Sequence, residues 1–135
     1  MIILDTSFVV SYFNKRDQNH LQAVKLMKET VNIIYGPLCI TNSIFGEVVT
    51  VCLLRLKSLR KASQIGNTLL NSMKIIEVDK TSFDQAWHLF SKQKNTIFSF
   101  TDCTTVSVMR ENDIKNIATF DEDFGKIKGI NVVGL

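Results

Sequence analysis

The sequence is poor in the residues that mark fibrous, disulfide-stapled or membrane-spanning proteins. One proline and six glycines among 135 residues exclude a collagen-like or low-complexity chain. Its three cysteines, Cys39, Cys52 and Cys103, are odd in number and far apart, which argues against a disulfide framework and paired zinc ligands. The longest nearly apolar window, residues 44–54, contains Glu47 and is too short to cross a bilayer.

No strong excess of charge of either sign is present. Sixteen basic and 13 acidic residues leave a net charge of +3, which permits a nucleic-acid partner without requiring one. A hydrophobic content of 45% predicts a folded chain with one core, so we expect a single domain over residues 1–135. No basic segment precedes the first apolar run, and Asp5 interrupts that run. We therefore expect no signal peptide and a cytoplasmic protein with reduced thiols and no membrane partner.

Short apolar runs alternate along the chain with longer segments of helical period. The predicted strands cover residues 2–4, 38–41, 75–78, 116–119 and 132–133. The predicted helices cover residues 6–13, 17–30, 42–59, 62–73, a segment capped by Thr81 or Ser82, and 101–110. This alternation predicts an α/β fold with a parallel sheet covered on both faces. Functional residues of such sheets lie beyond the carboxyl ends of the strands.

Two acidic residues follow predicted strands. Asp5 ends the apolar run in IILDTS, and Asp121 follows a strand in ATFDEDF. A buried charge without a partner costs several kcal/mol, so a carboxylate at the end of a buried strand needs an explanation. One explanation is local: Asp5 could cap the next helix, and Asp121 could form a turn.

Two further acids lie on the apolar sides of predicted helices. Glu47 follows Ile44 by three residues, and Asp102 precedes Val106 by four. Glu47 could instead reach a lysine, and Asp102 could be a first-turn acid that the helix dipole favours. If the four acids converge at one sheet edge, their mutual repulsion requires a cation. Carboxylates with water suit Mg²⁺ or Mn²⁺.

Four segments in this order, LDTS, TNSIFGE, SFTDC and ATFDEDF, resemble the motifs of a PIN domain over the whole chain. As a free-standing domain, the chain is most similar to the VapC-type ribonuclease toxins of prokaryotic toxin–antitoxin pairs. The resemblance implies a Rossmann-like, three-layer α/β/α sandwich with a parallel sheet of about five strands. It also implies a homodimer, a small antitoxin protein as partner, and an endoribonuclease that hydrolyses single-stranded RNA with Mg²⁺ or Mn²⁺.

The resemblance assigns the catalytic, metal-binding role residue by residue. The four acids that match the family's motifs are Asp5, Glu47, Asp102 and Asp121. Asp123 remains open: it could bind the metal directly, act through water or face solvent. Three hydroxyl residues would support the site: Thr6 or Ser7 would orient the first carboxylate, and Thr119 would assist.

An RNA substrate, single-stranded or structured, also requires basic contacts. Arg55 is the leading substrate-binding candidate because it follows Glu47 by eight residues in the same predicted helix. The other candidate cations are Lys57, Arg60, Lys61, Lys92, Lys94, Lys126 and Lys128. Three aromatic residues could stack on bases or pack in the core: Tyr12, Phe13 and Phe124.

Other functions remain possible at this point. A PIN-domain nuclease of RNA processing or decay, or a non-catalytic RNA- or protein-binding module of the same fold, would share these motifs. A receiver domain is disfavoured because the strand over residues 38–41 leads into Asn42 rather than an aspartate. A haloacid-dehalogenase-type phosphatase is disfavoured because Ser7 stands where a second aspartate would be needed.

Overall fold

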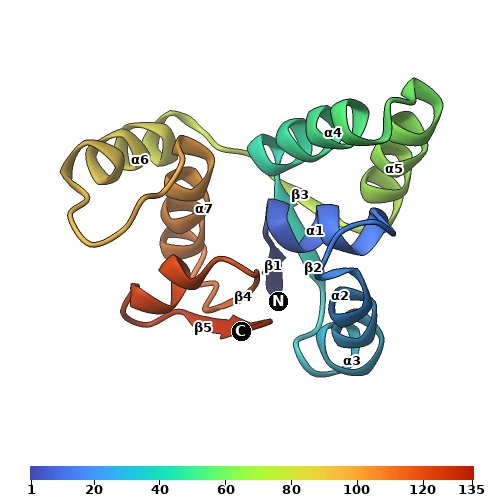
Figure 1. Cartoon of the computed structure of the whole chain (residues 1–135). Coiled ribbons are helices and arrows are strands. Elements are labelled where there is room, and N and C mark those ends of the chain that lie inside the picture. The colour runs from blue at the N-terminus through green and yellow to red at the C-terminus, as the bar shows by residue number, and fades with distance from the viewer.

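A computed structural model describes the backbone of residues 1–135 and the side chains of all of them except Thr30 and Asn32. Its centre is one parallel sheet in the order β3-β2-β1-β4-β5 (Figure 1). The strands are β1 (Ile2–Leu4), β2 (Leu38–Thr41), β3 (Lys74–Ile76), β4 (Asn116–Ala118) and β5 (Asn131–Val133). The five predicted strands are therefore confirmed, with small shifts at their ends.

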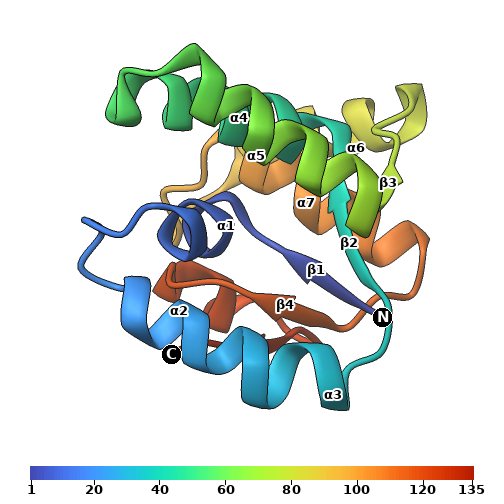
Figure 2. The same ribbon diagram turned by 90° about the vertical axis from the view of Figure 1, so that its right-hand side faces the viewer.

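Helices cover both faces of the sheet. The first group is α1 (Thr6–Phe13), α2 (His20–Leu26), a π-helical turn (Met27–Val31), α3 (Asn32–Ile34), α4 (Asn42–Leu56) and α5 (Leu59–Ser72). The second group is α6 (Lys80–Lys92), α7 (Phe100–Glu111) and the 3₁₀ helix η2 (Glu122–Lys126). Helices α1 to α5 lie on one side of the sheet and α6 and α7 on the other (Figures 1 and 2). The predicted three-layer arrangement is confirmed.

Several helix boundaries differ from the prediction for local reasons. The helix predicted to be capped by Thr81 or Ser82 begins at Lys80, because its cap is Asp79, whose carboxylate accepts the Ser82 N–H at 2.8 Å. The helix predicted to run to residue 59 ends at Leu56, because Lys57 takes a left-handed conformation with φ of 51°. Ser58 then accepts a hydrogen bond from the Lys61 N–H and starts α5 earlier than predicted. The helix predicted from residue 17 begins at His20, because the Asp17 carboxylate accepts the Asn19 N–H in a turn.

The central strand explains the apolar start of the chain. Ile2, Ile3 and Leu4 are completely buried, as expected for a parallel strand covered on both faces. For Phe124, the sequence left both base stacking and core packing open. In the structure it is completely buried and packs against Phe98, with ring centroids 4.8 Å apart. It therefore belongs to the core.

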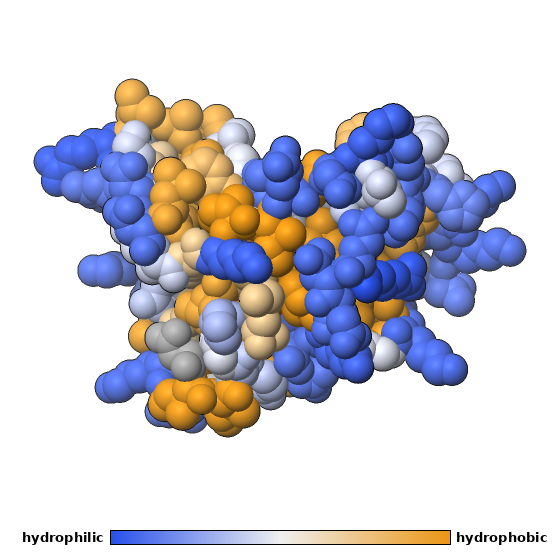
Figure 3. All heavy atoms as spheres, turned by 180° about the vertical axis from the view of Figure 1, so that it is seen from behind, coloured by the Kyte–Doolittle hydropathy of each residue, from blue (hydrophilic) through white to orange (hydrophobic). Residues whose placement is uncertain are grey.

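Several large apolar side chains remain on the surface. On the α4–α5 side they are Leu53, Leu54, Leu59 and Leu70, and Figure 3 shows hydrophobic side chains gathered over this part of the molecule. Trp87 and Phe83 of α6 are also exposed, against Phe100 at the start of α7. In the part of the chain that the structure describes, no helix is long and apolar enough to cross a membrane.

Gly134 follows the last residue of β5 and lies against Thr119, the residue after β4. It has a φ of 125°, and a Cβ at this position would lie 2.4 Å from the Thr119 carbonyl oxygen. The adjacent Val133 carbonyl accepts a hydrogen bond from the Thr119 N–H at 3.0 Å. Only glycine fits this close approach without moving Thr119.

Gly134→Ala is expected to lower the free energy of unfolding by about 1–3 kcal/mol, through backbone strain and the contact with Thr119. Urea unfolding followed by circular dichroism measures the change. Gly125→Ala is the matched control, because a Cβ there meets no atom within 4 Å. Equal stabilities of the two variants would contradict this account of Gly134.

Candidate functional site

Asp5 lies at the junction of β1 and α1. Its N–H donates to the Ala118 carbonyl of β4 at 2.9 Å, which fixes the residue at the carboxyl edge of the sheet. Its Oδ2 caps α1 and accepts hydrogen bonds from Ser7 Oγ at 2.7 Å and Thr119 Oγ1 at 2.8 Å. Its Oδ1 is buried and has no hydrogen-bond partner among the described residues. The capping explanation of Asp5 is therefore confirmed, and its second oxygen is left without a partner among the described residues.

Glu47 reaches the same edge from α4. Its Oε2 accepts a hydrogen bond from Thr6 Oγ1 of α1. Sequence alone could not decide which hydroxyl, Thr6 or Ser7, supports the first carboxylate. The structure divides them: Ser7 orients Asp5, and Thr6 orients Glu47.

Asp102 lies in the first turn of α7. Ser99 and Asp102 form a capping box, in which the Ser99 N–H donates to Asp102 Oδ2 at 2.8 Å and the Asp102 N–H donates to Ser99 Oγ at 3.1 Å. Burial, and then the charges of Asp5 and Asp121, raise the pKa of Asp102 to about 7. The Asp102 carboxylate thus helps to cap α7 and is repelled by the charges of Asp5 and Asp121.

Asp121 is placed by the turn after β4. Its N–H donates to Thr119 Oγ1 at 3.0 Å, and its Oδ1 accepts the Asp123 N–H at 2.9 Å as the cap of η2. Thr119 is fully buried and therefore contacts two of the four acids at once, Asp5 through its hydroxyl proton and Asp121 through its oxygen.

All four acids line one cavity of about 360 Å³. Two charged residues that share its wall are Asp17 and Arg55, with an Arg55 nitrogen 3.6 Å from Asp17 Oδ2. The sequence predicts a substrate-binding role for Arg55 but none for Asp17, which the helical period places at the start of a helix. Asp17 is held instead by Ser11 Oγ at 2.9 Å, so its position depends on a contact that no periodicity indicates. Ser99 was also missed, although the spacing S-x-x-D is a readable capping signal.

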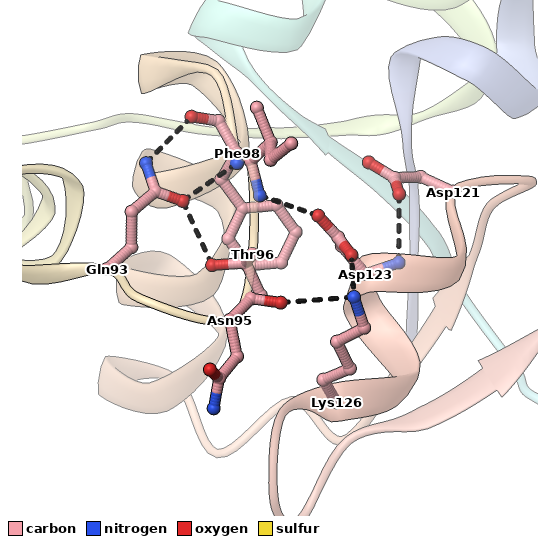
Figure 4. Close-up of polar contacts among 8 residues, drawn as sticks. Gln93, Asn95, Thr96, Phe98, Asp121, Asp123 and Lys126 are labelled. Atoms are coloured by element: carbon pink, nitrogen blue, oxygen red, sulfur yellow. Dashed lines mark hydrogen bonds and ion pairs between the residues drawn. The ribbon is translucent and has the colours of Figure 1, made fainter.

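Asp123 does not line this cavity, and its carboxylate lies between Lys126 and the loop before α7 (Figure 4). Its Oδ2 accepts the Ile97 N–H at 2.6 Å, and its Oδ1 lies 2.5 Å from Lys126 Nζ. The hydrogen bond from Lys126 lowers the pKa of this carboxyl. Both oxygens are thus engaged in joining η2 to the loop before α7. Asp123, whose role the sequence left open, is therefore not among the residues that line the cavity of the four acids.

The donor set fits a hard divalent cation. Burial raises the pKa of Asp5 against the opposing hydrogen bonds of Ser7 and Thr119, so its ionised form lacks compensation at the free Oδ1. Carboxylate oxygens are the ligands that such cations prefer. Among the described side chains, however, no three His, Cys, Asp or Glu residues close into a compact metal-binding group. The four acids line the cavity without forming so compact a group.

Comparisons with known proteins agree with this geometry. The sequence matches the model of the PIN domain over residues 2–130. It is 27% identical to the 23S rRNA-specific endonuclease VapC20 of Mycobacterium tuberculosis, over 92% of each chain. The predicted resemblance is confirmed at the level of the family.

Solved structures give the same result for the fold. The crystal structure of VapC20, a sarcin–ricin loop cleaving toxin, superposes with a TM-score of 0.83 over 93% of this chain and 94% of that one. A toxin–antitoxin complex from Klebsiella pneumoniae, at 17% identity, gives a TM-score of 0.67 over 98% of this chain and 96% of that one. At that identity the likeness concerns the fold alone.

Asp5→Asn is expected to stabilise the protein in EDTA at pH 8, raising Tm by on the order of 5 °C. The amide keeps the helix cap and removes a buried charge. Burial raises the folded-state pKa of Asp5 above 3.8. The stability that the protonated carboxyl contributes is therefore complete below that pH and is lost as the pH rises through the folded-state pKa. The gain should therefore grow from pH 4 upward, as scanning calorimetry measures.

Asp84→Asn is the control for this prediction. Asp84 is exposed on α6, where it pairs with Lys80, so its replacement should change stability only slightly at any pH. A destabilised Asp5→Asn protein, or a gain independent of pH, would contradict the burial argument.

Proposed function

Because the chain belongs to the PIN domain family, we propose that it is a metal-dependent endoribonuclease and the toxin of a type II toxin–antitoxin pair. The observation that carries the proposal is the arrangement of the four acids around one cavity at the carboxyl edge of the sheet, with Asp5 Oδ1 buried and unpartnered among the described residues. We propose residues 1–135 as one nuclease domain.

The acids would hold Mg²⁺ or Mn²⁺. Asp5 supplies the central oxygen, and Glu47, Asp102 and Asp121 complete the site directly or through water. A divalent cation bound there supplies Lewis acidity, which favours ionisation of a water and offsets the charge that develops on the phosphate.

The remaining residues of the site position these carboxylates. Ser7 and Thr119 hold Asp5 Oδ2, which leaves Oδ1 without a hydrogen-bond partner among the described residues. Thr6 fixes the rotamer of Glu47 through its hydroxyl. Arg55 lines the same cavity and is the one cation on its wall within the described residues, so it suits a contact with the substrate phosphate.

RNA is the proposed substrate, single-stranded or as a loop. The relative of 27% identity acts on 23S rRNA, so a ribosomal stem-loop is the first substrate to test. We also propose two protein partners, a second copy of the chain and a small antitoxin. Light scattering of the purified chain would test the first, and co-expression with any small reading frame adjacent to its gene, followed by light scattering, would test the second.

The wild type is expected to cleave RNA with Mg²⁺ or Mn²⁺ and to lose cleavage in EDTA. Asp5→Asn and Asp102→Asn should each lower the cleavage rate by at least about a hundredfold, because each removes charge that the cation requires. Gel analysis of end-labelled RNA measures the rates.

Asp123→Asn is the matched control. It removes one carboxylate close in sequence to Asp121 but outside the cavity, and should keep the rate within about tenfold. Metal-dependent cleavage retained by Asp5→Asn would overturn the site assignment. Absence of cleavage by the wild type on single-stranded and stem-loop RNAs would favour a binding module instead.

Thr119→Val is expected to lower the cleavage rate by about 10- to 100-fold, since outer contacts of metal ligands have effects of this size. Valine keeps the buried shape but loses the hydrogen bonds to Asp5 and Asp121. Thr119→Ser restores the hydroxyl and should recover most of the rate. Isothermal titration with Mn²⁺ should show a matching loss of metal affinity, which a purely structural role of Thr119 would not produce. Equal rates for the valine and serine variants would contradict this role.

A further inference from the structure

We propose that a second cavity, basic and adjacent to the acidic one, binds the phosphate backbone and one base of the RNA strand that passes through the site. The inference rests on the proposed function and names a part of the molecule that holds the substrate away from the cleaved bond.

This basic cavity has a volume of about 540 Å³ and lies where the end of α1 meets α4 and α5, on the right of Figure 1. The cations on its wall are Lys15, Arg16, Arg55 and Lys61. Its other lining residues are neutral, and the one acid of the described chain that pairs with any of these cations is Asp17, 3.6 Å from Arg55 on the side of the acidic cavity. The remaining three cations make this cavity an attractive site for a polyanion.

Three of these cations are available to a ligand. Lys15, Arg16 and Lys61 are exposed, and none of them forms an ion pair with a residue that the structure describes. Near α6, by contrast, Lys126 is engaged by Asp123 and by the Asn95 carbonyl. Of the three available cations the sequence suggests Lys61 alone, and the structure adds Lys15 and Arg16.

Arg55 joins the two cavities, since it lies on the wall of each. It follows Glu47 by eight residues in α4, which places them about 12 Å apart along the helix axis. A strand that reaches the acids can therefore continue past Arg55 into the basic cavity without a break. The cations there offset the repulsion between its phosphates and the acidic wall.

Phe13 favours RNA over an acidic protein as the occupant. Its half-buried ring lines the basic cavity beside the cations, with Gln64 and Thr68 as hydrogen-bonding neighbours. Alternating cations and aromatic rings suit a single strand, whose phosphates pair with the cations while its bases stack. An acidic polypeptide supplies carboxylates but no base for the ring.

The test is RNA binding in EDTA, where cleavage does not interfere. Fluorescence anisotropy of a labelled single-stranded RNA gives Kd over roughly 50–300 mM KCl. The triple variant Lys15→Gln/Arg16→Gln/Lys61→Gln should bind about tenfold more weakly or worse at the middle of this range. The slope of log Kd against log salt should fall by about 2, since each lost phosphate contact on a single strand accounts for about 0.7.

The matched control removes three cations from the opposite edge of the sheet. Lys74 begins β3, Lys115 precedes β4, and Arg110 lies exposed in the last turn of α7, which leads into β4. Lys74→Gln/Lys115→Gln/Arg110→Gln should leave both the affinity and the slope unchanged. An equal loss in the two triple variants would overturn the proposal, because it would show a general effect of net charge. An unchanged slope in the first triple variant would also overturn it.

Phe13→Leu separates RNA from an acidic protein. Leucine preserves apolar packing, so the variant should fold with near-normal Tm, bind RNA several-fold more weakly and keep the salt slope. Its affinity for poly-L-glutamate, the probe for an acidic protein, should not change. Loss of poly-L-glutamate binding with unchanged RNA binding would assign the cavity to a protein and overturn the proposal.

These results are independent of catalysis. Wild-type protein that binds RNA through this cavity but cleaves none with Mg²⁺ or Mn²⁺ would refute the proposed nuclease and leave the basic cavity standing. If the wild type cleaves RNA with metal while the Lys15/Arg16/Lys61 triple variant keeps the wild-type affinity for RNA, the nuclease stands and the basic cavity is refuted.

Discussion

The buried carboxylate of Asp5 is the constraint on which the site depends. Its backbone is tied to β4, one of its oxygens is saturated by Ser7 and Thr119, and the other is left free. This arrangement needs β1 and β4 side by side, and their pairing is the point where the strand order changes direction. Crevices at such points are where α/β sheets bind ligands. The contacts that hold Asp5 between β1 and β4 therefore also leave its Oδ1 without a hydrogen-bond partner among the described residues.

Stability and chemistry compete at the residues around Asp5. Asp102 helps to start α7 through the capping box, yet its carboxyl is repelled by Asp5 and Asp121. A folded chain that brings these charges together holds free energy that a bound cation can recover. Thr119 donates to the Asp5 carboxylate and accepts the backbone N–H of Asp121, which ties both residues to the same edge of the sheet.

Much of this could be predicted from sequence, for physical reasons. Buried parallel strands appear as short apolar runs, and acids at strand ends or on apolar helix faces violate the pattern that surrounds them. Asp17, Lys15 and Arg16 could not be assigned, because the loop after α1 has no periodicity and its place is set by contacts such as that of Asp17 with Ser11. Whether Asp123 joins Asp121 at the site could not be decided from the sequence either. Only the tight η2 turn directs the two side chains to different neighbours.

Helix α4 carries Glu47 on the wall of the acidic cavity and Arg55 where that cavity joins the basic one. A helix is stiff, and the rise per residue sets the separation of two of its side chains. On the proposed roles, α4 therefore holds a carboxylate of the cleavage site and an arginine beside the binding cavity at a constant spacing. RNA bound in both cavities would then be cut a set length of strand away from the phosphates that the cations hold.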